Sequence, residues 1–199
     1  MLVYFIRHGE TDLNKEHLLQ GHIDTELNPE GIRQSIAAKD LIIKKSLFFD
    51  KIYCSLLKRA VQTAEIITEK NISDFDIREE LVEIDYGPYD GISIKSLDAP
   101  MMNFLRNPNS IESPSGVESL QEVRERCGRF LKELSTKNFD RVLIVSHGIA
   151  IHSMFAYINH NYLNKELSWN NLQVGNCDMF CSNCIDQKYM EIKKVFAIH

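Results

Sequence analysis

The stretch Leu2-Val3-Tyr4-Phe5-Ile6-Arg7-His8-Gly9-Glu10-Thr11 decides the fold of this chain. The apolar run 2–6 predicts a buried β-strand that ends directly in Arg7-His8-Gly9. A second apolar run, 142–145, ends in the same way in Ser146-His147-Gly148. Parallel strands present their carboxyl ends at the edge of the sheet where ligands bind. We therefore expect His8 and His147 to meet at one sheet edge, beside Arg7, in an anion site.

Strand and helix signals alternate in the first half of the chain. Asn28-Pro29-Glu30 predicts a helix that runs to about Lys45, because an N-cap is followed by proline at the first helical position. The residues expected to face inward from this helix are Ile32, Ile36 and either Leu41 or Ile43. Residues 51–54 form a predicted strand, and Ser55 is the expected cap of a helix from Leu57 to about Thr68. That helix has Val61, Ala64 and Ile67 spaced for burial.

The second half continues the alternation after an irregular region. Residues 71–117 are expected to be a loop with short helices over the sheet edge. Then follow a helix from Glu118 to about Ser135, a strand at 141–145 and a helix from Ile149 to about Asn159. Two closing strands, near 172–182 and 189–196, are expected to join across Asp186-Gln187-Lys188. This order predicts a three-layer α/β/α sandwich around a mostly parallel sheet, in a single domain over residues 1–199.

The composition is that of an ordinary globular protein, with 44% hydrophobic residues among 199. The net charge of −5 and the lack of a basic run argue against a nucleic-acid partner. No apolar stretch approaches the ~20 residues that cross a bilayer, and no basic segment precedes the first strand, so we expect neither a membrane partner nor export. Five cysteines, an odd and unevenly spread set, suit reduced thiols in a cytoplasm. The sequence carries no signal for an oligomeric state.

The types of residue at the sheet edge suit phosphoryl chemistry. A neutral imidazole at His8 is a competent nucleophile toward phosphorus, and the guanidinium of Arg7 would hold phosphate oxygens. Arg59 lies near the start of the second predicted helix, where a helix N-terminus also favours an anion. Alternatively, His8 and Arg7 are surface neighbours and Arg59 is a solvated helix residue.

A phosphoester also needs a proton donor for its leaving oxygen, and Glu83 is the candidate carboxylic acid. Composition alone leaves Glu79, Glu80 and Asp85 as rivals. His147 can donate a hydrogen bond to a phosphate oxygen. Two histidines and a carboxylate could instead bind a metal, but nearby arginines would repel a divalent cation. We therefore expect neither a metal nor a cofactor.

These motifs occur in the order that is typical of one known family. Arg7-His8-Gly9-Glu10-Thr11 resembles the signature of the histidine phosphatase superfamily, which includes the phosphoglycerate mutases. The further matches along the chain are Asn14, Gln20-Gly21, Asp24, Leu27 and Gly31, the segment from Ser55 to Ala64, Glu83 with Gly87 and Gly91, Pro114 to Ser119, and Val145 to Gly148.

The resemblance implies a role for each matching residue. His8 becomes phosphorylated, Arg7, Arg59 and His147 surround the phosphate, and Glu83 is first the proton donor and then the base that activates water. Four further residues are carried over to the substrate-binding pocket: Asn14, Gln20, Gly21 and Gly148. The implied activity is metal-independent hydrolysis of a small phosphorylated metabolite. Its substrate specificity is expected to lie in residues 84–117 and around 162–176.

Three alternatives remain. The cofactor-dependent phosphoglycerate mutases that the chain resembles carry an arginine after the acid and an Arg-Arg pair, whereas Ile84 follows Glu83 and Arg106 stands alone in its segment. A phosphate-binding module without catalysis would typically lack His8 or Glu83, and both are present. Finally, Cys177, Cys181 and Cys184 have the spacing of radical S-adenosylmethionine enzymes. They lie, however, in a predicted hairpin, where Cys177, Met179 and Cys181 would share one strand face.

Overall fold

The computed structural model describes residues 1–108, 111–163 and 173–198. In this part of the chain seven strands form one sheet. The strands are β1 (Leu2–Arg7), β2 (Lys51–Cys54), β3 (Asp76–Ile77), β4 (Arg141–Ser146), β5 (Met179–Ile185), β6 (Lys188–Tyr189) and β7 (Lys193–Phe196). Their order is β3-β2-β4-β1-β5-β6, and β7 also pairs with β5. The chain therefore places β1 and β4 side by side at the centre.

The two halves of the sheet differ in strand direction. β1, β2, β3 and β4 pair in parallel. β5 runs antiparallel to β1, and β6 and β7 run antiparallel to β5. The left-handed residues Asp186 and Gln187 form the predicted turn after β5, but Lys188 already belongs to β6, and the single strand predicted at 189–196 is two strands, β6 and β7. The carboxyl ends of β1 and β4 thus lie at the same edge, which is the arrangement that a ligand site requires.

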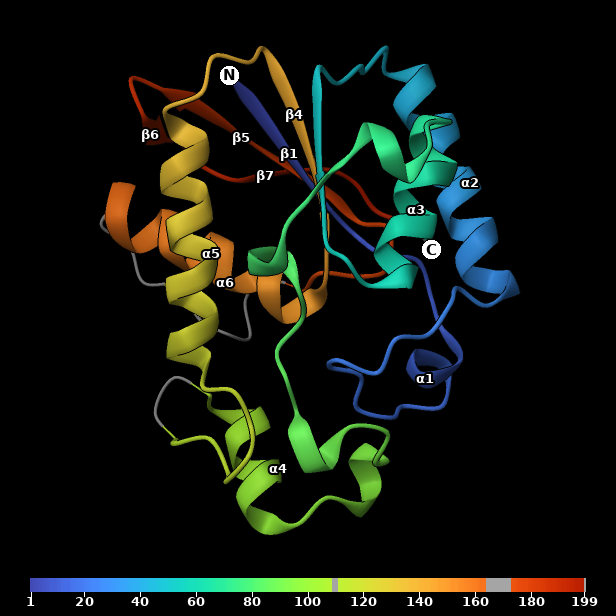
Figure 1. Ribbon diagram of the computed structural model, residues 1–199, viewed down its shortest axis with the longest axis vertical. Coiled ribbons are helices and arrows are strands. Elements are labelled where there is room, and N and C mark those ends of the chain that lie inside the picture. Colours follow the sequence, from blue (N-terminus) through green and yellow to red (C-terminus); the bar gives the residue numbers. More distant parts are fainter. Residues whose placement is uncertain (109–110, 164–172, 199) are drawn as a thin grey trace.

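Helices cover both faces of the sheet (Figure 1). The helices are α1 (Asp12–Lys15), α2 (Pro29–Lys44), α3 (Lys58–Thr68), α4 (Ala99–Arg106), α5 (Leu120–Ser135) and α6 (Gly148–Tyr162). Figure 1 shows α5 and α6 on one face and α2 and α3 on the other. Four 3-10 turns lie between β2 and α4: Ile72–Asp74, Glu79–Leu81, Gly87–Tyr89 and Ile94–Ser96. The three-layer α/β/α arrangement is confirmed. In the described residues 71–108 and 111–117 the expected short helices are present, but β3 is a strand that the sequence did not predict.

The central strands supply both cores by simple alternation. In β1, Val3 and Phe5 pack under α5 and α6, while Tyr4 and Ile6 pack toward α2 and α3. β4 and β2 alternate in the same way. Strands that are buried on both faces read as continuous apolar runs, which is why 2–6 and 142–145 are so easily recognised.

The inward face of α2 differs from the predicted one. Ile32 and Ile36 are 44% and 45% exposed, so these two predictions are wrong, and of the alternatives Leu41 and Ile43 it is Leu41 that packs inward, because Ile43 is 62% exposed. The buried residues are instead Gly31, Ser35, Ala38 and Ile42, with Leu41 partly buried. Small side chains line this face because the first turn of α2 packs backbone to backbone against the loop after β1. A hydropathy pattern does not recognise glycine and serine as core residues.

Three element boundaries also differ from prediction. Ser55 does not cap α3; the N-cap is Leu57, which makes no side-chain capping bond. Within the described residues β5 begins at Met179 rather than near 172, because Cys177 has left-handed backbone (φ 56°) in the turn before the strand. Residue 172 lies outside the described part of the chain. α5 begins at Leu120 behind a capping box formed by Ser119 and Glu122, two residues after the expected start.

Among the described residues, no helix combines the length and the apolar character needed to cross a membrane.

Candidate active site

The carboxyl ends of β1 and β4 bring two histidines together. Arg7 pairs with Ser146 in the ladder, and the His8 N–H donates to the Ser146 carbonyl at 3.0 Å. The imidazole rings of His8 and His147 follow at once, with centroids 5.1 Å apart. Both rings are buried. The expected meeting of the two histidines at one sheet edge is confirmed.

The ring of His8 is held in one orientation and one tautomer. Its Nδ1 lies 2.7 Å from the Gly9 carbonyl oxygen. Because a carbonyl can only accept, Nδ1 carries the proton, and Nε2 keeps its lone pair. Burial lowers the pKa of His8 well below the ordinary value, and the positive charges of Arg59 and Arg7 lower it further. His8 is therefore a neutral imidazole near pH 7, with Nε2 available as a nucleophile.

Two guanidinium groups, the fully buried one of Arg59 and the half-buried one of Arg7, lie close enough to the imidazoles to act on their charge. Arg59 is fully buried on the first turn of α3 and donates to the carbonyls of Ile23 (2.9 Å) and Gly21 (2.8 Å). Arg7 donates to the Val174 carbonyl at 2.9 Å. Burial lowers the pKa of Arg59 to about 10, so it remains charged at neutral pH. Both side chains have a buried Nε that meets no hydrogen-bond acceptor among the described residues. The site thus offers fixed cationic donors of the kind that hold phosphate oxygens.

Glu83 lies against the N-terminus of α6. Its Oε1 accepts from the backbone N–H groups of Ile84 (3.0 Å) and Ala150 (3.1 Å), and its Oε2 accepts from that of Ile149 (3.1 Å). The side chain is 6% exposed. Gly148 separates this carboxyl from a guanidinium: a Cβ atom built on Gly148 would lie 3.7 Å from both Glu83 Oε2 and Arg7 Nε. Of the four carboxyl groups considered from the sequence, Glu83 is placed with the histidines and arginines.

His147 makes a contact that the sequence does not predict. Its Nε2 lies 2.7 Å from the hydroxyl of Ser55, which follows β2. Its Nδ1 is buried and has no hydrogen-bond partner in the described part of the chain. Burial lowers the pKa of His147 well below the ordinary value, and Arg59, His8 and Arg7 add to the effect. Both imidazoles are therefore neutral.

The remaining predicted pocket residues lie around this centre in different ways. Asn14 caps α1, and its Oδ1 accepts from the Thr11 N–H (3.3 Å) and from Asn176 (3.5 Å). The Gln20 amide is used within its own loop, where it accepts from the Thr11 hydroxyl at 2.7 Å and donates to the hydroxyl of Thr25. The Gly21 carbonyl holds Arg59. Their direct contact with substrate stays a prediction.

Three supporting residues were missed from the sequence. Thr63 accepts from the Gly9 N–H (3.0 Å) and donates to the Arg59 carbonyl (2.7 Å), so it joins the loop after β1 to α3. Asn176 donates to the His8 carbonyl at 2.9 Å. Asp90 accepts from the backbone N–H groups of residues 21–23. Only Thr63 has a sequence signal, because it lies one helical turn after Arg59.

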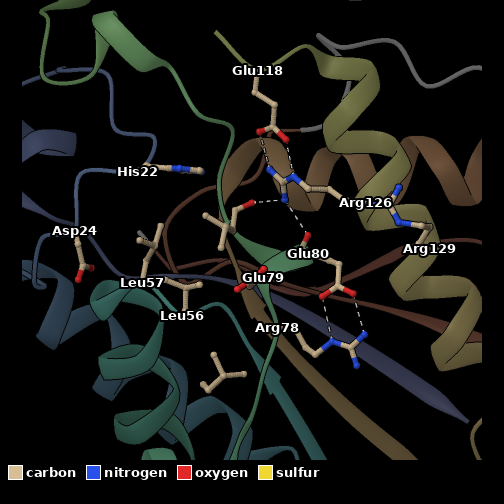
Figure 2. A pocket seen from close by; sticks show the side chains of 12 residues that line it. His22, Asp24, Leu56, Leu57, Arg78, Glu79, Glu80, Glu118, Arg126 and Arg129 are labelled. Carbon is tan, nitrogen blue, oxygen red and sulfur yellow. Dashed lines mark hydrogen bonds and ion pairs between the residues drawn. The ribbon is translucent and has the colours of Figure 1, made fainter. Parts of the chain in front are cut away.

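A pocket of about 970 Å³ lies beside residues 79–83, which we call the acid-bearing segment because they include Glu83 (Figure 2). Its charged side chains are of both signs, and Figure 2 shows Arg126 of α5 reaching across it to Glu118. His22 lines the same pocket, and its Nε2 lies 3.0 Å from the Glu83 carbonyl oxygen. This pocket therefore borders the backbone that carries Glu83.

Neither alternative metal site is assembled in the described residues. No group of three or more histidine, cysteine, aspartate or glutamate side chains is arranged there to hold an ion. Cys177 and Cys181 pack in the core on the α2 side, whereas Cys184 packs in the core on the α5 side. The sheet thus separates the three cysteines that share the radical-enzyme spacing, and all five thiols are unpaired.

Comparison with known proteins agrees with this geometry. A family model described as "Histidine phosphatase superfamily (branch 1)" matches residues 3–192. The chain is 30% identical over 173 residues to the putative phosphoserine phosphatase 2 of Hydrogenobacter thermophilus, covering 84% of this chain and 82% of the relative. It is 34% identical over 158 residues to the uncharacterized phosphatase PhoE of Bacillus subtilis, covering 79% and 77%.

A solved structure shares the whole architecture. It is a phosphoserine phosphatase mutant from Entamoeba histolytica in complex with phosphoserine, with 25% identity and a TM-score of 0.79 over 96% of each chain. The family match spans both histidine motifs, both arginines and Glu83. The chain is a phosphatase and belongs to the histidine phosphatase superfamily.

Proposed function

We propose that this protein is a metal-independent phosphomonoesterase that hydrolyses a small phosphorylated metabolite through a phosphohistidine at His8. One observation carries the proposal. The Nδ1–H of His8 is donated to the Gly9 carbonyl, which leaves a neutral Nε2 beside His147 and within the field of the Arg59 and Arg7 guanidinium groups. A nucleophile with a free lone pair in a cationic pocket suits attack on a phosphate ester.

The proposed reaction has two steps. In the first, the His8 Nε2–P bond forms as the P–O ester bond breaks, and the protonated Glu83 carboxyl gives its proton to the leaving alcohol. In the second, the Glu83 carboxylate takes a proton from water, the water oxygen bonds to phosphorus, and the N–P bond breaks to release phosphate and neutral His8. Arg7, Arg59 and His147 hold the phosphoryl oxygens in both steps.

Hydrolysis is favoured over mutase activity by the surroundings of Glu83. Ile84 is 1% exposed and packs in the core under α5 and α6, at the position where the mutases that the chain resembles place an arginine. Water is then the expected final acceptor of the phosphoryl group.

We also propose a location and a domain organisation. The unpaired thiols support a cytoplasmic location. Residues 1–199 act as one phosphatase domain.

The decisive experiment compares His8→Ala with His17→Asn, a change at an exposed histidine on left-handed backbone that asparagine tolerates. The wild type and His17→Asn are expected to release phosphate from p-nitrophenyl phosphate with and without chelator, and to form an acid-labile phosphoenzyme. His8→Ala should do neither while keeping its unfolding transition. Turnover by His8→Ala would overturn the mechanism, and phosphate binding without release by the wild type would indicate a binding module.

A panel of phosphorylated metabolites would identify the substrate class. Phosphoserine, phosphoglycerates, sugar phosphates, nucleotides and α-ribazole phosphate are the compounds to include, because relatives are named for several of them. Specificity is expected in residues 84–117 and around 162–176. Of the latter, residues 164–172 lie outside the described part of the chain.

A further inference from the structure

We propose that Arg126 of α5 is a positioning residue for Glu83. The inference rests on the proposed function, in which Glu83 protonates the leaving group. The Arg126 guanidinium lies behind the backbone of the acid-bearing segment, on the pocket side that Figure 2 shows. It acts through main-chain contacts to this segment.

One guanidinium holds three carbonyl groups of this segment. Arg126 Nη1 donates to the carbonyls of Glu80 (2.9 Å) and Val82 (2.6 Å), and Nη2 donates to the carbonyl of Glu83 itself (3.1 Å). No strand ladder includes residues 82 and 83 in the described sheet. These three bonds therefore help to fix the position of the Glu83 backbone.

Glu118 fixes Arg126 in turn. Arg126 Nε donates to Glu118 Oε1 (2.8 Å) and Nη2 donates to Oε2 (3.0 Å), in a bidentate pair. Glu118 Oε2 also accepts from the Asp85 N–H at 3.1 Å, two residues after the acid. A guanidinium has five N–H donors in a rigid fork, and Arg126 makes five hydrogen bonds with them. Lysine, with a single ammonium centre, cannot reproduce this pattern.

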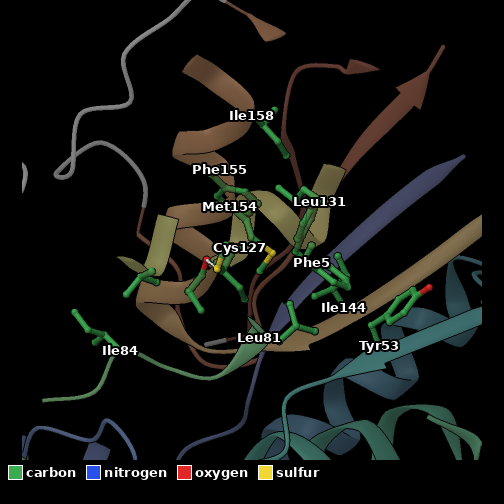
Figure 3. Packing of buried hydrophobic residues seen from close by; sticks show 14 of the residues in the cluster. Phe5, Tyr53, Leu81, Ile84, Cys127, Leu131, Ile144, Met154, Phe155 and Ile158 are labelled. Carbon is green, nitrogen blue, oxygen red and sulfur yellow. Dashed lines mark hydrogen bonds between the residues drawn. The ribbon is translucent and has the colours of Figure 1, made fainter. Parts of the chain in front are cut away.

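Arg126 is anchored by the packing of α5, and Glu83 is held by contacts on the other side of the segment. Arg126 is followed by Cys127, which is fully buried, and Figure 3 shows Cys127 and Leu131 of α5 packed against α6. On the other side of the segment, His22 Nε2 contacts the same Glu83 carbonyl. The carboxyl is held by the N-terminus of α6, so both the backbone and the side chain of Glu83 are fixed. A general acid needs this precision to reach the leaving oxygen.

Arg129 provides a matched control. It lies one helical turn after Arg126 on α5 and lines the same pocket. It is exposed and has no hydrogen-bond partner among the described residues. Replacing Arg129 therefore removes a positive charge from the same helix and pocket without touching the acid-bearing segment.

The experiment compares phosphate esters with good and poor leaving groups. A poor leaving alcohol depends on Glu83 for its proton, whereas p-nitrophenolate leaves with little help. For Arg126→Met we expect kcat to fall about tenfold or more on an alkyl phosphate and less than about threefold on p-nitrophenyl phosphate, with vanadate inhibition unchanged. Arg126→Lys should recover part of the loss, and Arg129→Met should match the wild type on both substrates.

The ratio of the two kcat values separates positioning from folding, because loss of folded protein lowers both rates equally. If kcat falls by the same factor on the alkyl phosphate and on p-nitrophenyl phosphate, in both Arg126→Met and Arg126→Lys, the proposal is overturned. If Arg126→Met does not fold, Arg126→Lys and Glu118→Gln supply the ratio, and a wild-type ratio in both would overturn it. Glu83→Gln is the reference. If only Glu83→Gln loses more kcat on the alkyl phosphate than on p-nitrophenyl phosphate, the role of Arg126 is wrong but the acid role of Glu83 stands. If Glu83→Gln loses kcat equally on both substrates, the acid role in the proposed function is wrong as well.

Discussion

The hydroxyl of Ser55 sets the direction in which His147 can donate a proton. Ser55 Oγ accepts from the Leu57 N–H at 3.3 Å and lies 2.7 Å from His147 Nε2. The proposed role of His147 as a donor to phosphate requires that the Ser55 hydroxyl give its own proton to Nε2, while a lone pair of the same hydroxyl accepts from Leu57. The imidazole proton then sits on Nδ1, the buried nitrogen without a partner in the described residues. In this tautomer His147 donates to a phosphate oxygen.

Ser55→Ala is therefore expected to weaken binding of the phosphoryl group. Loss of one buried hydrogen bond costs about 1 kcal/mol, which corresponds to roughly five- to tenfold weaker inhibition by vanadate or phosphate. Nitrogen-15 NMR should show the proton of His147 moving from Nδ1 toward a mixture of tautomers.

Ser153→Ala is the matched control for Ser55→Ala. Ser153 is also fully buried, and its hydroxyl has no partner in the described part of the chain. For Ser153→Ala, the inhibition constant of vanadate or phosphate should stay at the wild-type value. An unchanged constant in Ser55→Ala, or an equal loss in Ser153→Ala, would contradict the assigned tautomer.

At this scale the sequence predicts which side chains gather at the sheet edge better than it predicts the residues that hold them in place. His8, Arg59 and Glu83 belong to ordered motifs at element ends. Arg126 and Asn176 instead bind backbone carbonyls of segments far away in the sequence. Backbone carbonyls are the same in every residue, so a sequence motif cannot indicate which carbonyls these side chains bind.

At the scale of elements, the first turn of α2 fixes the loop that carries His8. The loop and the helix meet through glycines: a Cβ atom on Gly31 would lie 2.0 Å from the Glu10 carbonyl oxygen, and one on Gly9 would lie 2.5 Å from the Gly31 carbonyl oxygen. The contacting atoms are backbone, which cannot move aside as a flexible side chain can. Close packing of α2 is thus a condition for the position of His8.

Gly31→Ala is expected to destabilise the protein by about 1–3 kcal/mol, because an extra methyl group must push the helix away from the loop. Urea unfolding gives this change, and kcat should fall as the loop after β1 shifts. Ile36→Ala on the same helix should change stability by less than about 0.5 kcal/mol, since Ile36 is 45% exposed. A loss in Ile36→Ala as large as that in Gly31→Ala would contradict the special role of the glycine contact.

The same helix explains why sequence patterns predict some elements better than others. α5 presents Leu120, Val123, Cys127 and Leu131 to the core at helical spacing, and all four are buried. α2 reverses the usual rule, because its close approach needs glycine, serine and alanine inside and leaves isoleucines outside. Hydrophobic periodicity reports which side chains are apolar, and it reports burial only where the helix packs through its side chains.

At the scale of the whole molecule, the order of strands and helices predicts the layers but not the full sheet. The alternation from β1 to α6 gives parallel strands with helices on both faces. The position of β5 beside β1 has no local signal, because it depends on which sheet edge remains open after β2 and β3 have paired on the other side. The pairing of β5 is therefore decided by which strands occupy the edges of the sheet, and not by the residues of β5 alone.

Burial of two neutral imidazoles links the stability of the whole fold to pH. The pKa values of His8 and His147 are lowered in the folded protein, chiefly by burial and then by Arg59. In the unfolded chain they return to about 6.5, so below that pH the unfolded state binds more protons than the folded state. Stability should be independent of these groups above pH 7 and should fall as the pH drops from about 6.5 toward the folded pKa values. The limit is about 1.4 kcal/mol per pH unit for each histidine.

Urea unfolding between pH 7.5 and 5.5 isolates this effect. Arg78 lowers the pKa of Glu80 and Glu133, so these carboxylates contribute stability above the carboxyl range near 4.5 and lose it only below that range. His8→Asn and His147→Asn should each make the fall in stability shallower, because each removes one group that the unfolded chain protonates. His17→Asn, a substitution at an exposed histidine outside the site, is the control variant. A wild-type stability that stays flat down to pH 5.5 would mean that the two imidazoles accept protons in the folded site, and His8 would then be cationic where the proposed attack on phosphorus needs a lone pair.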